Sequence, residues 1–160
     1  MRKVRYGEHR LKSGVTVIYR PFVQGDSRRV SEILLDNFRP LEKEMGPTWW
    51  KEVIEEVYRE ENIPKLDRER DYRVVTMRGE VVGLGGFIPY TDTSGEMSNL
   101  SVNPKFHGMS IGKFLVLLRL GEKIEHGITK FYAYTGKQSG RIYQQLGFVE
   151  EPMPESPYGK

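Results

Sequence analysis

The stretch SVNPKFHGMSIGKFLVLL, residues 101–118, decides the fold, because an extended segment gives way there to an apolar helical pattern. Proline cannot donate to a β-ladder, so residues 96–104 are predicted to be a strand that ends at Pro104. Beyond the proline, apolar side chains recur at the spacing of an amphipathic helix: Ile111, Phe114, Leu115 and Leu118. A strand-to-helix junction with two glycines therefore occupies residues 107–112.

This junction has two interpretations. The first turn of a helix leaves backbone N–H groups without partners, and the helix dipole adds partial positive charge there. Gly108 and Gly112 would let an anion approach these amides, and three side chains add positive charge: Lys105, His107 and Lys113. Alternatively, the turn needs glycine only for its backbone shape. The stretch by itself leaves both interpretations open.

Upstream of the junction, the chain alternates between strand and helix patterns. A β-branched and aromatic run predicts a strand over residues 15–22, and Asp26 is placed to cap a helix that carries Val30, Ile33, Leu34 and Phe38. A second helix is expected from Thr48 to Pro64. Residues 72–90 predict a hairpin that turns at Arg78-Gly79.

Downstream, the first helix after the junction is expected to end near His126-Gly127, and a short strand follows over residues 130–134. Ser139 is placed to cap a short helix that Gly147 stops, and residues 148–151 are expected to form a last strand. The fold class is therefore α/β (α+β), with a mixed, mostly antiparallel sheet flanked by helices. The expected order is β-α-α-β-β-β-α-β-α-β.

Length and composition exclude several classes of protein. The 160 residues indicate a single domain, with residues 1–13 and 152–160 expected to be flexible tails. The chain has no Cys and only three scattered His, so the sequence predicts no disulfide and no metal site. No apolar run approaches the ~20 residues that span a bilayer. We expect a cytoplasmic protein without a membrane partner, and a homodimer stays open.

Charge is distributed unevenly along the chain. Residues 105–145 carry seven Lys or Arg against two acids, whereas residues 31–71 carry twelve acids against seven Lys or Arg. Such blocks are either solvated surface or lobes that attract an anion and a cation, respectively. A nucleic-acid partner is not expected, because the charge is modest and no recognisable motif is present.

The junction and a second segment together resemble the GCN5-related N-acetyltransferase (GNAT) family, over roughly residues 81–151. The family's pyrophosphate loop, Arg/Gln-x-x-Gly-x-Gly/Ala after a Val-x-Pro strand end, is matched by Val102, Pro104, Gly108, Ile111, Gly112 and Leu115. Here His107 replaces Arg or Gln, and Ser110 replaces Gly. The family's later signature is matched by Ser139, Tyr143, Gly147 and Phe148, with Gly136 in place of Asn.

The resemblance implies acetyl-CoA as a co-substrate, bound in an opening between the strands at residues 96–102 and 130–134. The cofactor-binding residues that it implies are Leu100, Ser101, Val102, His107, Gly108, Met109, Ser110, Ile111, Gly112, Lys113 and Ser139. Backbone groups near Leu100 and Val102 would pair with the pantetheine arm. Amides of the 107–112 loop would hold the pyrophosphate.

The implied reaction moves an acetyl group to a primary amine by direct attack on the thioester. Tyr143 would protonate the departing thiolate, and Glu96 is the expected base, although a solvated acid at a turn and a water chain are alternatives. Glu96, Ser98 and Leu100 would share a strand face unless a bulge intervenes near Asn99. Tyr90 and Tyr134 are candidate acceptor contacts. The alternative function is a non-catalytic CoA-binding or interaction module with the same fold.

Overall fold

A computed structural model describes residues 6–41, 71–135 and 137–151. Its strands are β1 (Gly7–Arg10), β2 (Thr16–Pro21), β3 (Arg73–Met77), β4 (Glu80–Thr91), β5 (Ser94–Val102) and β6 (Lys130–Ala133). Its helices are α1 (Ser27–Phe38), α5 (Ile111–Glu125) and α6 (Lys137–Gln145), with short 3-10 turns at η1 (Arg39–Leu41) and η3 (Pro104–Phe106). The expected second helix at 48–64 lies outside the described residues.

The strands form one six-stranded sheet in the order β1-β2-β3-β4-β5-β6. Every neighbouring pair is antiparallel except β5 and β6, which run parallel because α5 crosses over between them. This architecture confirms the expected fold class, a mixed and mostly antiparallel sheet flanked by helices. The opening stretch accordingly supplies the end of β5 and the start of the crossover helix.

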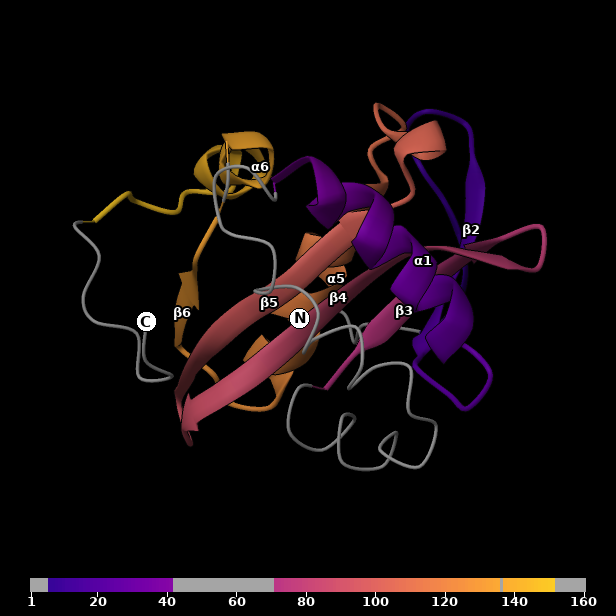
Figure 1. Ribbon diagram of the computed structural model, residues 1–160. Coiled ribbons are helices and arrows are strands. Elements are labelled where there is room, and N and C mark those ends of the chain that lie inside the picture. The colour runs from indigo at the N-terminus through magenta and orange to yellow at the C-terminus, as the bar shows by residue number, and fades with distance from the viewer. Residues whose placement is uncertain (1–5, 42–70, 136, 152–160) are drawn as a thin grey trace.

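The two long helices cover opposite faces of the sheet (Figure 1). On one face, α1 buries Val30, Ile33 and Leu34 against Leu84 and other residues of β3 and β4, and none of these four side chains is more than 1% exposed. On the other face, α5 buries a second set that includes Val17, Val75, Val82, Ile111 and Leu115. A third cluster, with Phe87, Met97, Val116 and Tyr143, joins α5 to α6.

Local turn signals account well for the connections between these elements. Arg78 and Gly79 both have positive φ, 52° and 81°, as a two-residue hairpin turn between β3 and β4 requires. Gly127 follows α5 with φ 94°, and the Ile128 N–H donates to the Lys123 carbonyl at 2.9 Å. The expected helix end at His126-Gly127 is therefore confirmed.

Three terminal features differ from expectation. Residues 7–10 were expected within a flexible tail but form β1, a strand whose polar residues suit the edge of a sheet, where local patterning is weak. The last strand expected at 148–151 is wrong, because these residues make no ladder and Val149 is 82% exposed. Ser139 does not cap α6, because that helix begins two residues earlier, at Lys137.

Asp26 occupies the position before α1 but does not cap it through its side chain. Its carboxylate instead forms a two-pronged ion pair with Arg20 at 2.7 and 2.8 Å and accepts from the Val23 N–H at 2.9 Å. The arginine fork is a stronger partner for a carboxylate than a neutral amide. Asp26 thus ties the end of β2 to the start of α1.

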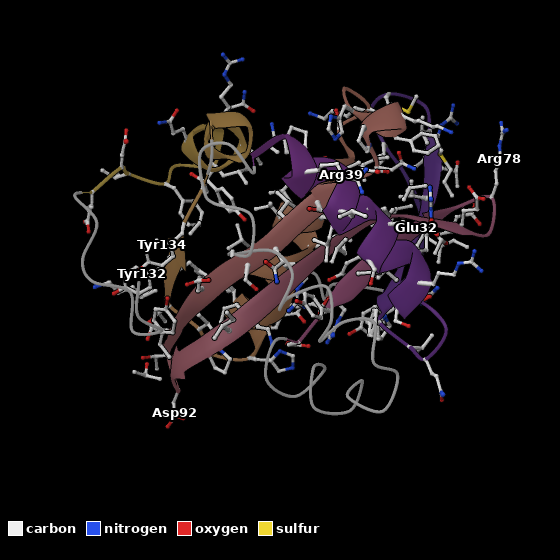
Figure 2. The ribbon with its side chains drawn as sticks, in the orientation of Figure 1. Glu32, Arg39, Arg78, Asp92, Tyr132 and Tyr134 are labelled. Carbon is white, nitrogen blue, oxygen red and sulfur yellow. The ribbon has the colours of Figure 1, made fainter. Side chains whose placement is uncertain are left out.

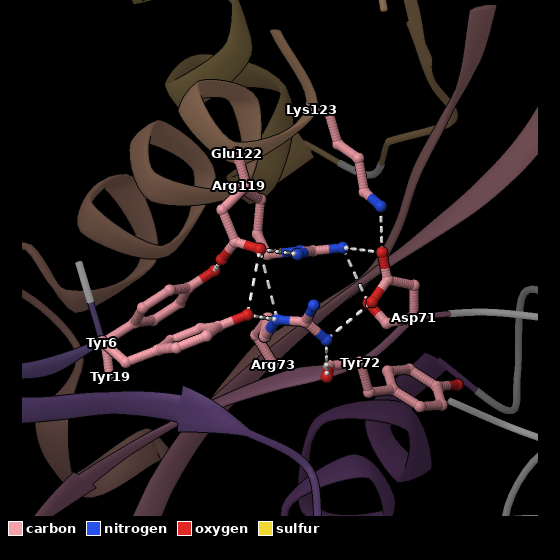
Figure 3. A network of polar contacts seen from close by, with 8 residues as sticks. All are labelled: Tyr6, Tyr19, Asp71, Tyr72, Arg73, Arg119, Glu122 and Lys123. Atoms are coloured by element: carbon pink, nitrogen blue, oxygen red, sulfur yellow. Dashed lines mark hydrogen bonds and ion pairs between the residues drawn. The ribbon is translucent and has the colours of Figure 1, made fainter. Parts of the chain in front are cut away.

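A buried polar network joins α5 to β2 and β3 (Figure 3). Arg119, which is 1% exposed, lies 3.2 Å from both Asp71 and Glu122, and Arg73 pairs with the same two acids at 2.6 and 3.3 Å. Lys123 also pairs with Asp71. Burial alone would raise the pKa of Asp71, but the charges of Arg119, Lys123 and Arg73 outweigh it and lower that pKa.

Among the helices that the structure describes, none has the length and apolar character needed to cross a lipid bilayer.

Candidate active site

The parallel pair β5–β6 separates at the place where the opening was expected. The ladder runs from Ser94 opposite Lys130 to Met97 opposite Ala133, and β5 then continues to Val102 without a partner on that side. The Asn103 N–H donates to the Val82 carbonyl at 2.7 Å, so Val102 lies between ladder bonds and its own backbone groups point away from β4. An extended ligand would therefore meet the Val102 N–H on this edge, whereas the Val102 carbonyl already accepts from the Asn37 side chain.

A β-bulge interrupts β5 just before that edge. Leu84 pairs with Ser101 and Gly86 with Ser98, so Asn99 and Leu100 together face Gly85, and Asn99 has φ 49°. This is the bulge that was raised as the exception to strand alternation. It turns Leu100 toward the α5 face, where Leu100 packs against both clusters there, so Leu100 does not share a face with Glu96 and Ser98.

The opposite face keeps the polar residues of β5. The Asn99 side chain donates to the Tyr72 hydroxyl at 2.7 Å. Gly86 has no room for a side chain, because a Cβ there would stand 2.7 Å from Ser98 Oγ and 2.9 Å from the Tyr72 ring. Only glycine therefore fits at position 86, where neighbouring groups approach the backbone closely. This close approach brings β3, β4 and the bulge into contact on the α1 side of the sheet.

The Val102 carbonyl is a meeting point of three segments. It accepts from the Asn37 side chain of α1 at 2.9 Å, and His107 Nε2 lies 2.8 Å from the same oxygen. His107 was expected to line the pyrophosphate loop, but its ring folds back onto β5. No local pattern marks Asn37 as a partner of Val102, because the two residues lie 65 positions apart in the chain.

The loop before α5 has the features of an anion site. Gly108 and Ser110 have positive φ, 83° and 66°, and the Ser110 side chain makes no capping hydrogen bond. No acid lies in the first turn of α5, and Lys105 and Lys113 are exposed beside it. The N–H groups of Ile111, Gly112 and Lys113 have no acceptor within the helix, as at any helix start. These donors and charges fit a pyrophosphate.

Gly112 and Met109 have packing roles in this loop. A Cβ on Gly112 would stand 3.2 Å from Ile142 of α6 and 3.7 Å from Val102. Met109 packs against the cluster under α5, and its carbonyl accepts from Ser13 at 3.2 Å. The loop is therefore anchored on α6 on one side and on the β1–β2 connection on the other.

Tyr143 lies on α6 and is 5% exposed. Its ring packs edge-on against Phe148, with 5.0 Å between centroids, and α6 ends in a turn at Gly147 that returns the Phe148 N–H to the Tyr143 carbonyl at 3.0 Å. Burial raises the pKa of Tyr143, and the negative charge of Glu96 raises it further. Tyr143 therefore stays protonated at neutral pH and lies within electrostatic reach of Glu96.

Tyr143 also lines a narrow crevice, too tight to hold a water molecule, together with Met97, Ser98, Leu100 and Arg119. The Ser98 Oγ and the Arg119 Nε, both buried, have no hydrogen-bond partner among the described residues. A larger hollow of about 390 Å³ lies between Asp71, Asp92, Lys123 and His126, away from these residues. We place the candidate site at this crevice, because the bulge of β5 and Tyr143 of α6 both line it.

Glu96 stands opposite Ile88 on β4 and Tyr132 on β6. The Tyr90 hydroxyl donates to Glu96 Oε1 at 2.6 Å. Burial raises the pKa of Tyr90, and so does its hydrogen bond to the Glu96 carboxylate. Glu96 is therefore a half-buried carboxylate held by a tyrosine. Tyr132 was not among the expected site residues, although alternation along residues 130–134 places it on the same face as Tyr134.

The structure brings most of the predicted site residues to one end of β5, within the loop, or onto α6. The side chain of Ser139 is not among those described, although its backbone lies in the first turn of α6. Most of the acidic block, including Glu52, Glu55 and Glu56, lies outside the described residues.

Comparison with known proteins places this chain among acetyltransferases. The model of the acetyltransferase (GNAT) family matches residues 30–148. The N-acetyltransferase YjgM of Escherichia coli is 32% identical over 83 residues, which cover 48% of this chain and 50% of the relative. The matched part thus spans about half the length of that curated relative.

Solved structures share the fold at low identity. The PaiA N-acetyltransferase of Thermoplasma acidophilum, in complex with coenzyme A, has a TM-score of 0.72 at 17% identity and covers 86% of this chain and 92% of its own. A GCN5-related N-acetyltransferase of Ralstonia eutropha has a TM-score of 0.68 at 20% identity, with coverage of 88% and 97%. Ard1 of Thermoplasma volcanium has a TM-score of 0.64 at 22% identity, with coverage of 85% and 84%.

Proposed function

Because the chain belongs to the acetyltransferase (GNAT) family, we propose that it moves an acetyl group from acetyl-CoA to a primary amine. The observation that carries this proposal is the unpaired edge of β5 at Val102, which lies beside a helix start without acids. An extended amide-bearing arm suits the first feature and a pyrophosphate suits the second. Acetyl-CoA carries both groups in one molecule.

The binding roles follow from backbone geometry. Leu100, Ser101 and Val102 supply the strand edge, and the Val102 N–H faces the gap because the residue lies between ladder bonds. The amides of residues 108–112 donate to the pyrophosphate, and Lys113 adds charge next to them, whereas the His107 N–H already donates to the Pro104 carbonyl. His107 acts by holding the loop on the Val102 carbonyl rather than by contacting phosphate. Ser139, in the first turn of α6, is a further contact.

The chemistry needs two proton transfers. The amine nitrogen attacks the thioester carbonyl and loses a proton to Glu96, directly or through water, while the carbon–nitrogen bond forms. The tetrahedral oxyanion is stabilised by a backbone N–H at the bulge, near Leu100 or Val102. The carbon–sulfur bond then breaks, and Tyr143 protonates the departing thiolate. The raised pKa of Tyr143 keeps the phenol protonated at neutral pH but makes it a weaker acid, so the role depends on a position next to the departing sulfur.

A thiol assay for CoA release, run with a panel of primary amines, tests the activity. Tyr143→Phe should lower kcat by ~10²-fold, as expected for loss of a general acid, with little change in acetyl-CoA affinity. Phenylalanine keeps the ring packed on Phe148, so the variant should fold. Equal turnover in the variant would remove Tyr143 as the acid.

The alternative is a CoA-binding module without turnover. It is favoured by the burial of Tyr143, whose hydroxyl has no hydrogen bond within the described residues to aim it. Calorimetry with acetyl-CoA separates the cases. Micromolar binding without CoA release across the panel supports the module, and no binding refutes both functions.

A further inference from the structure

The bulge at Asn99 interrupts a long ladder that is regular on either side of it. β5 runs beside β4 from the hairpin tip near Asp92 toward the end of α1 near Arg39 (Figure 2). Asn99 has φ 49°, in the left-handed region that an L-residue enters at a cost, although Asn tolerates it better than most residues. Such a conformation persists where the surrounding structure holds it in place. The contacts of Asn99 therefore decide whether the bulge keeps its shape.

Tyr72 makes the side-chain contact that holds Asn99. The Asn99 side-chain amide donates to the Tyr72 hydroxyl at 2.7 Å, and Tyr72 is 0% exposed. A hydrogen bond away from water is electrostatically stronger than the same bond in solvent. The Tyr72 ring also lies 2.9 Å from the point where a Cβ on Gly86 would stand, so it fills the space beside the bulge.

Tyr72 is itself fixed from two directions. Its ring packs against Phe22 in the cluster under α1, with 6.0 Å between the two centroids. Its backbone lies between Asp71 and Arg73, whose side chains belong to the buried ion network, and Figure 3 shows the Tyr72 ring pointing away from that network. The Arg119 guanidinium donates to the Asp71 carbonyl at 2.7 Å. The Arg73 guanidinium donates to the Tyr72 carbonyl at 2.9 Å. The Tyr72 hydroxyl is therefore a fixed point against which β5 is held.

We propose that Tyr72 is a positioning residue for acetyl transfer: its hydroxyl acts through Asn99 to hold the bulge, and the bulge aims a backbone N–H near Leu100 at the thioester carbonyl. The inference rests on the proposed function, in which such an N–H stabilises the tetrahedral oxyanion. A donor of this kind is effective only if it already points at the oxygen, and a displacement of about 1 Å can cost ~10²-fold in rate. Tyr72 has no exposed surface, so it acts without touching the substrate.

The first test compares two tyrosines that are equally buried. Tyr72→Phe removes the hydroxyl and keeps the ring packed on Phe22. We expect kcat to fall about 10-fold, because the donor is less well aimed. The affinity for acetyl-CoA should change by no more than about twofold, because the Val102 edge and the pyrophosphate loop lie beyond the bulge.

Tyr19→Phe is the matched control. It removes another fully buried hydroxyl, which donates to Glu122, and it leaves the ion pairs of the network in place. Hydrogen bonds to charged groups contribute more to stability than neutral ones, so Tyr19→Phe should lower Tm at least as much as Tyr72→Phe while kcat stays unchanged. An equal loss of kcat in both variants would trace the effect to stability and overturn the proposal, as would an unchanged kcat in Tyr72→Phe.

A double-mutant cycle shows whether Tyr72 acts through Asn99. Asn99→Ala removes the donor and should lower kcat at least as much as Tyr72→Phe. If the two side chains act through one hydrogen bond, Tyr72→Phe added to Asn99→Ala should cost no more than about a further twofold. A further loss of about 10-fold in the double variant would show that Tyr72 acts by another route, and the proposal would be wrong. Melting curves show whether each variant is folded at the assay temperature.

The bound thioester reports on the bulge without turnover. A hydrogen bond to the carbonyl oxygen polarises the C=O bond, so the carbon-13 NMR signal of acetyl-CoA labelled at the acetyl carbonyl moves downfield. We expect this shift on binding to the wild type and to Tyr19→Phe, and a signal nearer that of free acetyl-CoA in Tyr72→Phe. Equal shifts in the wild type and Tyr72→Phe, or no shift in the wild type, would contradict the positioning role.

These measurements separate the positioning role from the proposed function. A downfield shift that depends on Tyr72, without acetylation of any amine in the panel, would refute the activity and support the role of the bulge. Acetylation with the same kcat and the same shift in Tyr72→Phe would leave the activity and remove Tyr72 from it. A protein that binds no acetyl-CoA would refute both.

Discussion

The Glu122→Gln variant should be much less stable than the wild-type protein, although the substitution changes little more than one atom. Glu122 is 5% exposed, pairs with Arg119 and Arg73 at 3.2 and 3.3 Å, and accepts from Tyr19 and Tyr6 (Figure 3). The network holds three cations against two carboxylates, and the substitution leaves three against one. Arg119 would become a buried cation with reduced compensation.

The magnitude follows from that burial. Removing one partner of a buried ion pair costs about 3–5 kcal/mol, because the other charge stays desolvated. The Arg119 Nε already lacks a partner within the described residues, so little spare hydrogen bonding is available to absorb the loss. For a chain of this size, 1 kcal/mol shifts Tm by about 2–4 °C. The expected fall in Tm is therefore roughly 6–20 °C.

Urea unfolding of the full chain, followed by circular dichroism, measures the loss. The midpoint should fall while the slope with denaturant stays unchanged. Glu125→Gln is the matched control, because Glu125 lies on the same helix and is exposed, and it should change the free energy of unfolding by less than about 0.5 kcal/mol. A loss below about 1 kcal/mol for Glu122→Gln would show that the network contributes little to stability.

Four further outcomes are expected. Ser110 has φ 66°, so Ser110→Val should be about 1–2 kcal/mol less stable than Ser110→Gly in urea unfolding, and equal stability would contradict the left-handed backbone. Activity should show no descending limb up to pH 10, because the pKa of Tyr143 is raised; a fall near pH 9 would contradict that shift. The pKa of Asp71 is lower in the folded protein than its value of ~3.9 in the unfolded chain. The ionised carboxylate therefore stabilises the fold above pH ~3.9, and this stabilisation is lost as the pH falls from there through the folded pKa. In Asp71→Asn, the free energy of unfolding should accordingly depend less on pH in the acid range. Asn37→Ala should change acetyl-CoA affinity in calorimetry while leaving the fold intact, and unchanged affinity would remove the Val102 carbonyl from the binding edge.

Local signals made much of the fold predictable. Helical spacing after Pro104 identified α5, and Arg78-Gly79 marked a turn because its backbone shape demands such residues. The bulge near Asn99 was also anticipated. In each case the information lies within a few residues of the feature that it specifies.

Long-range contacts were beyond reach for a physical reason. His107 meets Val102, and Asn37 meets the same carbonyl from α1, but no periodicity reports which polar side chain will find a given oxygen. Likewise Arg119 and Asp71 lie 48 residues apart. The strand β1 was not predicted, because an edge strand of polar residues lacks the alternation of apolar and polar side chains that marks a buried face.

The bulge at Asn99 divides β5 into two stretches with different surroundings. Before it, Glu96 and Ser98 point to the α1 side of the sheet, while after it Leu100 and Val102 point into the core under α5. Larger side chains at Leu100 or Val102 would therefore disturb the core under α5, whereas a larger side chain at Ser98 would disturb its contacts with Gly86 and Tyr72. One extra residue thus places alternate side chains of the two stretches of β5 on opposite faces of the sheet.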